Sequence, residues 1–175
     1  MSDGFEHYGY CERAVAQATA LLDDLCNSRF PDKQAIFRRR NKDRIVLRAL
    51  YDDLRRAFLT PIDREDLWCL CVAAEQVLFW TEETVLAATQ RQTEHIPTLW
   101  KELHTVCHAL QQAVVTFPHF RRDDVFFDHL NTVLLRFSQI CTAKRFSAEI
   151  GSGYPLLLAF EALAKQMQTA VLKNE

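Results

Sequence analysis

Glycine and proline are scarce in this chain, which has four glycines and five prolines among 175 residues. Apolar residues rarely alternate with polar ones, as they do in half-buried strands, so nothing in the sequence favours a β-sheet. The run of about eighteen apolar residues that a membrane-spanning helix requires is also missing. These absences favour an all-α protein that does not insert into a membrane.

An excess of charge of either sign is lacking as well. The formal net charge is −2 and the sequence pI is near 6.3. Such a balance gives no general attraction to nucleic acid or to an anionic membrane surface. Residues 1–6 contain neither the basic segment nor the apolar run of a secretion signal. We therefore expect a cytoplasmic protein that binds no nucleic acid.

Paired cysteine motifs of the CxxC type are absent from the sequence. The six cysteines fall mostly at apolar positions of helical patterns, which indicates reduced thiols in the core (Cys11, Cys26, Cys69, Cys71, Cys107 and Cys141). Cys69 and Cys71 are two residues apart, so on a helix they point about 200° away from each other and cannot share a metal ion.

Apolar residues recur at three- and four-residue spacing, which predicts amphipathic helices. Six such helices are expected. The first three span about 5–27, 34 to the Thr60-Pro61 step, and that step to about 90. The last three span 97–118, 126–141 and about 156–171, and a glycine-containing linker at 147–153 precedes the sixth. Short links favour an antiparallel bundle. We expect one domain over residues 1–175, in which a three-plus-three layout allows two related halves.

The step from the second helix to the third has the chemistry of a helix start. Thr60 is a candidate N-cap, Pro61 suits the first helical position, and Asp63 lies where a capping box has its acid. Glu65 and Asp66 add negative charge at the positive end of the helix dipole. Local helix chemistry alone therefore explains this stretch.

The residue sequence of this stretch is similar to that of a known protein family. Ala57-Phe58-Leu59-Thr60-Pro61-Ile62-Asp63-Arg64-Glu65-Asp66-Leu67 joins two long helices, and Val171-Leu172-Lys173-Asn174 lies near the C-terminus. In both stretches the chain resembles the PhoU-like phosphate-transport regulators, in particular the single-domain branch whose genes accompany low-affinity inorganic phosphate transporters. The resemblance implies a non-catalytic cytoplasmic bundle that modulates phosphate uptake or signalling by binding a membrane phosphate transporter or its associated regulators.

Many members of that family also bind clustered metal ions, through an acidic residue followed four positions later by Asp. Residues i and i+4 share one helix face, and carboxylates suit oxygen-rich metal sites. This chain departs from the pattern. Arg40 and Arg44 stand where the second helix should present acids. On the third helix, Phe79 stands four positions after Glu75, where the second acid is expected. On the last helix, Tyr154 and Leu158 stand at the positions expected to hold acids. Guanidinium groups and apolar side chains do not ligate cations, so we expect no metal at these positions.

One acidic pair with the right spacing remains, Asp124 and Asp128 at the start of the fifth helix. A single pair does not favour a tight multinuclear site. Solvated charges near a helix N-terminus are the favoured interpretation, and a metal site is the alternative.

A second candidate for metal is His104-Thr105-Val106-Cys107-His108, which places two imidazoles at i and i+4 with a thiol between them. That spacing can chelate zinc, but the Glu of an HExxH helix is replaced by Thr105. Two histidines at the edge of an apolar stripe and a core cysteine form the favoured interpretation.

Positive charge is concentrated on the second helix, where Arg38, Arg39, Arg40 and Arg44 could form an anion-binding or partner-binding face. A solvated helix face is the commoner explanation. The third helix is apolar over a wide arc because of Trp68, Phe79 and Trp80, which favours a central position over a homodimer patch.

No catalytic set emerges from the sequence, since it has no GxSxG motif and no glycine-rich phosphate loop. The first hypothesis is a regulatory bundle that acts by protein contact. The second is a sensor that binds metal through Asp124 and Asp128 or phosphate through the basic face. The third is a metal-dependent hydrolase built on His104 and His108.

Overall fold

The computed structural model describes residues 5–57, 60, 62–91, 98–121, 124–144 and 150–174. These residues form six α-helices and one 3₁₀ turn, and none of them is in a strand: α1 Phe5–Cys26, α2 Lys33–Arg56, α3 Arg64–Arg91, α4 Thr98–Thr116, η1 Phe117–His119, α5 Val125–Lys144 and α6 Ile150–Asn174. The all-α bundle expected from the apolar spacing is confirmed at this level. No helix in the described part of the chain combines the length and hydropathy of a membrane span.

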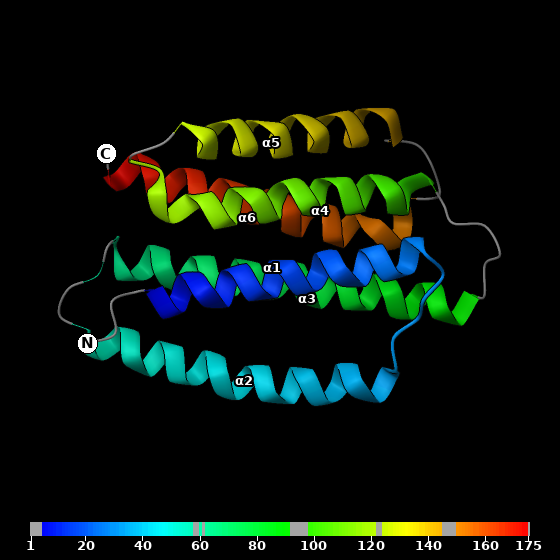
Figure 1. The fold of residues 1–175 in the computed structure, drawn as a ribbon, viewed down its shortest axis with the longest axis horizontal. Coiled ribbons are helices and arrows are strands. Elements are labelled where there is room, and N and C mark those ends of the chain that lie inside the picture. Colours follow the sequence, from blue (N-terminus) through cyan, green and yellow to red (C-terminus); the bar gives the residue numbers. More distant parts are fainter. Residues whose placement is uncertain are drawn as a thin grey trace.

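The helices lie side by side in stacked layers (Figure 1). α1 packs against α3 and α4, α3 packs against α6, and these four helices surround the core. α2 lies outside on α3, and α5 lies outside on α4 and α6. The second helix of each group of three is therefore the outer one.

Helix α1 ends where the sequence predicts, near Asn27 and Ser28. Ser28 adopts a left-handed conformation, with φ of 56°. This turn lets the Arg29 amide donate to the Asp24 carbonyl at 2.7 Å, a bond that satisfies one of the last carbonyls of the helix. Ser28 thus closes the helix in the role that glycine more often has.

Helix α3 begins later than the sequence predicts. Its first residue is Arg64, and the Asp63 carboxylate accepts a hydrogen bond from the Glu65 amide at 2.9 Å. The Asp63 carbonyl accepts from the Leu67 amide at 3.0 Å, so Asp63 is the N-cap. The prediction that Thr60 caps this helix is therefore wrong, because Asp63 offers the same acceptor three residues closer to the apolar stripe. Phe58, Leu59 and Pro61 lie outside the described residues.

Helix α6 begins earlier than predicted, at Ile150, so part of the expected linker is helical. Gly153 is buried in this helix, and a Cβ placed on it would lie 3.3 Å from Leu99 Cδ2 and Leu103 Cδ1. The glycine therefore allows close packing of α6 on α4, a role that a turn signal in the sequence does not distinguish from a linker.

Helix α2 contributes little to the core. Its buried residues are Ile36, Leu50 and Leu54. Phe37 and Ile45 are 47% and 73% exposed. Apolar burial alone holds this outer helix weakly, so polar contacts have a large share in its attachment.

Candidate functional site

Glu82 on α3 is a charged residue whose side chain is completely buried. Two arginines of α2 neutralise it. Arg39 binds both carboxylate oxygens, with Nη2 at 2.8 Å from Oε2, and Arg40 Nε donates to Oε2 at 2.7 Å. The Arg39 and Arg40 side chains are only 17% and 16% exposed. A buried carboxylate needs such partners, since an unpaired charge in this position would be very costly.

Arg40 connects this carboxylate with a second acid and with an aromatic ring. Its Nη2 donates to Glu83 Oε1 at 2.7 Å, and its guanidinium lies 4.5 Å from the centre of the Phe79 ring. Partial burial by itself would lower the pKa of Arg40, but the hydrogen bonds that it donates to Glu82 and Glu83 outweigh that effect and raise the pKa. Arg40 is therefore a fixed cation in the α2–α3 contact.

The same cluster reaches α1 through Asp43. The Tyr10 hydroxyl donates to Asp43 Oδ2 at 2.7 Å, and Arg39 Nη1 lies 3.4 Å from the same oxygen. Burial and the bond to Asp43 raise the pKa of Tyr10 far above its usual value. Near the other end of α2, the buried His7 ring of α1 donates from Nε2 to the Leu50 carbonyl at 3.1 Å. Three helices are thus tied together by polar contacts.

The basic face predicted on the second helix is divided by this arrangement. Arg39 and Arg40 point toward α3 and are used in the ion pairs. Arg38 and Arg44 are exposed on the outside of the helix, and Arg38 Nη2 lies 3.6 Å from Asp32 Oδ2. The four arginines therefore do not form one site.

The positions where the resemblance implies acidic pairs hold other chemistry. Arg40 covers Phe79, Arg44 is exposed, and Tyr154 and Leu158 are exposed at 48% and 42%. Glu75 binds the Gln76 side chain, and burial raises its pKa. Within the described ranges, no three His, Cys, Asp or Glu side chains gather as a metal would require. Arg39 and Arg40 supply the positive charge that the buried Glu82 needs, and Arg40 also pairs with Glu83.

The two stretches that carry the resemblance meet in space. Asp66, in the first turn of α3, is 2% exposed, and Lys173 Nζ from the end of α6 lies 3.0 Å from its Oδ1. Gln166 Nε2 lies 3.5 Å from the same oxygen. The hydrogen bond to Asp66 raises the pKa of Lys173. This contact joins residues far apart in the sequence.

Asp124 and Asp128 are both exposed at the start of α5. The Asp128 amide donates to the Asp124 carbonyl at 3.2 Å, which is the backbone bond of a helix start. No third acid or histidine of the described residues joins them as a metal ligand. Their position fits charges at a helix N-terminus.

The residues of the second metal candidate diverge. Cys107 is buried with its Sγ 3.4 Å from Thr19 Oγ1, and burial raises the pKa of the thiol to about 12. His108 is exposed, while His104 Nε2 lies 3.8 Å from Asp23 Oδ1. Cys107 therefore faces the core, away from the two imidazoles.

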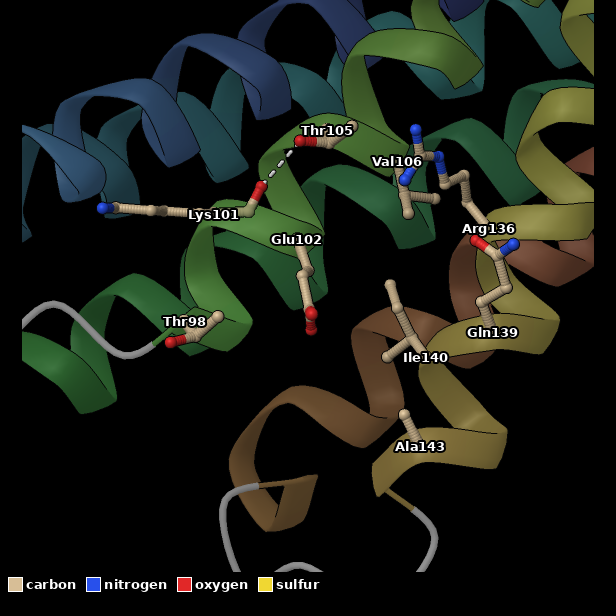
Figure 2. A pocket seen from close by; sticks show the side chains of 9 residues that line it. All are labelled: Thr98, Lys101, Glu102, Thr105, Val106, Arg136, Gln139, Ile140 and Ala143. Atoms are coloured by element: carbon tan, nitrogen blue, oxygen red, sulfur yellow. Dashed lines mark hydrogen bonds between the residues drawn. The ribbon is translucent and has the colours of Figure 1, made fainter.

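A pocket of about 270 Å³ lies between α4 and α5 (Figure 2). Figure 2 shows Glu102 pointing from α4 into the space, with Arg136 and Gln139 on the α5 wall beside Ile140. The Thr105 hydroxyl donates to the Lys101 carbonyl at 2.9 Å. Thr105 and Val106 of the second metal candidate line this pocket, but the described lining includes none of the candidate ligands His104, Cys107, His108, Asp124 and Asp128. The described lining of this pocket thus has acidic and basic groups but no activated nucleophile.

Sequence reasoning missed Glu82, Glu83 and the inward orientation of Asp43. A signal for Glu82 exists, because it lies four residues after Leu78 and three before Val85, which are both buried. An acid at such a position of an apolar stripe requires a cation from another helix. The adjacent arginines Arg39 and Arg40 are the cations that meet it.

Comparison of the chain with protein-family models, with curated proteins and with solved structures finds no match.

Proposed function

We propose that this protein is a non-catalytic regulator that modulates inorganic phosphate transport or signalling through protein contacts, as the PhoU-like resemblance implies. In this proposal the protein binds a membrane phosphate transporter from the cytoplasmic side, or binds the regulators associated with that transporter. Support comes from the two resembling stretches, which contact each other through Asp66 and Lys173, and from the bundle of six helices.

The observation that carries this choice among the hypotheses is the environment of Arg40. The resemblance implies a metal-binding acid at this position. Here a guanidinium binds Glu82 and Glu83 and stacks on Phe79. A cation cluster at this place would meet a fixed positive charge, so internal ion pairs replace metal as the means of neutralising the acids. This favours a regulator that acts by contact over one that senses metal here.

The distribution of charge supports binding of a partner. Helix α2 has nine lysines and arginines against three aspartates, a net charge of +6. The rest of the chain has twelve basic and twenty acidic residues, a net charge of −8. A strongly basic outer helix on an otherwise acidic protein can steer and orient a partner with an acidic surface.

The test is phosphate uptake in cells that carry the gene, compared with a deletion strain and with strains complemented by variants. Deletion should change the initial rate of radiolabelled phosphate uptake, and the wild-type gene should restore it. An unchanged rate would overturn the assignment to phosphate transport.

Metal analysis of the purified protein tests the competing hypotheses separately. The proposal predicts less than one metal ion per chain. Stoichiometric metal that is lost in Asp124→Ala/Asp128→Ala would support a sensor, and loss in His104→Ala would support a hydrolase. Either result would count against a purely contact-based regulator.

A further inference from the structure

One side of α2 carries five cations and two aromatic rings. These residues follow one another at spacings of three and four, which places them on one helix face. We name them the basic-aromatic stripe: Lys33, Phe37, Arg40, Arg44, Arg48, Tyr51 and Arg55. All except Arg40 are exposed.

The rings of the stripe lie close to its cations. Lys33 Nζ and the Arg40 guanidinium are each 5.9 Å from the centre of the Phe37 ring, and the Arg55 guanidinium is 5.9 Å from that of Tyr51. Phe37 and Tyr51 remain 47% and 42% exposed. Each end of the stripe therefore has an exposed aromatic ring beside cations, and Arg44 and Arg48 lie between the two ends.

Helix α3 extends this surface at the C-terminal end of α2. The Tyr51 ring lies 5.0 Å from Trp68, and Val72 is 38% exposed. An open groove of about 340 Å³ lies between α2 and α3, lined by Tyr51, Leu54, Arg55, Arg64, Glu65 and Trp68. An apolar side chain of a bound segment could pack against the Tyr51 and Trp68 rings in this groove.

Most of the positive charge on the stripe is available. Arg40 is neutralised by Glu82 and Glu83, whereas Arg44, Arg48 and Arg55 form no ion pair with any residue in the described ranges. Exposed cations beside aromatic rings suit carboxylates that arrive together with apolar side chains.

We propose that the basic-aromatic stripe docks an acidic amphipathic helix of a partner protein. This inference rests on the proposed function, because it specifies the contact through which the regulator would act. Four residues of α-helix span about 6 Å, so carboxylates at i and i+4 of a partner helix match Arg44 and Arg48. The stripe from Lys33 to Arg55 is about 33 Å long, enough for about six helical turns.

The charges beside the stripe favour a narrow partner over a broad anionic surface. Glu65 lines the groove, and Glu83 is 41% exposed next to Arg40. A flat anionic membrane or a nucleic-acid backbone would approach these carboxylates as well as the arginines, whereas a single helix can lie along the cations and avoid them. An acidic helix is therefore the occupant that the charge pattern fits.

Two synthetic helical peptides of about 24 residues provide the test, measured by calorimetry with the full chain at 0.1 M salt. One has Glu at i and i+4 beside a row of Leu, and the other has the same composition in scrambled order. The patterned peptide should bind at least about 10-fold more tightly, since only it presents both groups on one face. Equal affinity for the two peptides would overturn the proposal.

Variants then locate the binding. Arg44→Gln/Arg48→Gln should weaken the patterned peptide about 10-fold, as expected for two charge contacts. Lys101→Gln/Arg136→Gln removes two exposed charges from α4 and α5 and should change affinity less than about 2-fold. Circular dichroism and thermal unfolding check that each variant is folded, and a double substitution on α2 without effect on affinity would contradict the site.

Competition and sedimentation decide between occupants. Phosphatidylserine vesicles, a single-stranded RNA oligomer and a second copy of the chain should each bind more weakly than the patterned peptide. Tighter binding of any of them through Arg44 and Arg48 would overturn the acidic-helix assignment. Uptake of phosphate is read independently, so failure of the peptide experiment and failure of the proposed function are distinguishable.

Discussion

Replacement of Glu82 by Gln tests whether α2 is held by buried ion pairs. The substitution keeps the shape of the side chain and removes its charge, which leaves Arg39 and Arg40, both under 20% exposed, without their shared carboxylate. Breaking a buried ion pair from one side costs about 3–5 kcal/mol. For a domain of this size, that corresponds to a fall in melting temperature of about 6–20 °C.

The matched control is Glu83→Gln, which removes the neighbouring carboxylate of the same cluster. Glu83 is 41% exposed and binds only Arg40 among the described residues, so the expected loss is at most about 1 kcal/mol. Urea unfolding followed by circular dichroism measures both variants. Equal losses for Glu82→Gln and Glu83→Gln would refute the reasoning. A triple change, Glu82→Leu with Arg39→Met and Arg40→Met, should recover part of the stability, because it removes Glu82 and both arginines together but leaves Asp43 and Glu83 without their arginine partners.

Three further results are expected. Burial raises the pKa of Glu75, so the folded chain holds this proton more tightly than the unfolded chain and loses stability as pH rises through the folded-state pKa. Glu75→Gln should therefore raise the melting temperature at pH 7 and leave it unchanged below about pH 4. An equal gain at both pH values would contradict this. Lys173→Met should lower the melting temperature because it leaves the buried Asp66 carboxylate without its cation, and adding Asp66→Asn should restore part of the loss. Additive losses in this double-mutant cycle would show that the pair is not coupled. Prolonged treatment with EDTA should leave the unfolding curve unchanged, and a lowered melting temperature that returns with added divalent metal would count against the proposal.

The sequence predicted the helices well where one apolar stripe and one end signal agreed. α1 and the end of α4 fall at the expected places because Leu22, Leu25 and Val114 belong to unbroken stripes. Helix ends were less predictable. Thr60 and Asp63 both have side chains that can cap a helix, and the hydrogen bond from the Glu65 amide to Asp63 sets the start of α3. Gly153 is typical of a turn in sequence, but here it lies inside α6 and packs closely on α4.

The candidate site was less accessible to sequence reasoning than the fold. The positive charge of α2 is visible in the sequence, but which arginines turn inward depends on the position of α2 beside α3. Arg39 and Arg40 are adjacent, yet both reach Glu82 because long guanidinium side chains can bend around one carboxylate. Spacing along a single helix does not contain this information, since the partner is more than forty residues away.

The central claim, regulation of phosphate transport through contacts of α2, is tested most directly by the initial rate of phosphate uptake in a deletion strain complemented with Arg44→Glu/Arg48→Glu. The account predicts that this variant accumulates as a folded protein but fails to restore the wild-type rate, whereas Asp124→Ala/Asp128→Ala restores it. Full restoration by the Arg44→Glu/Arg48→Glu variant would contradict the claim that α2 is the contact surface, and an uptake rate that does not respond to deletion would contradict the claim as a whole.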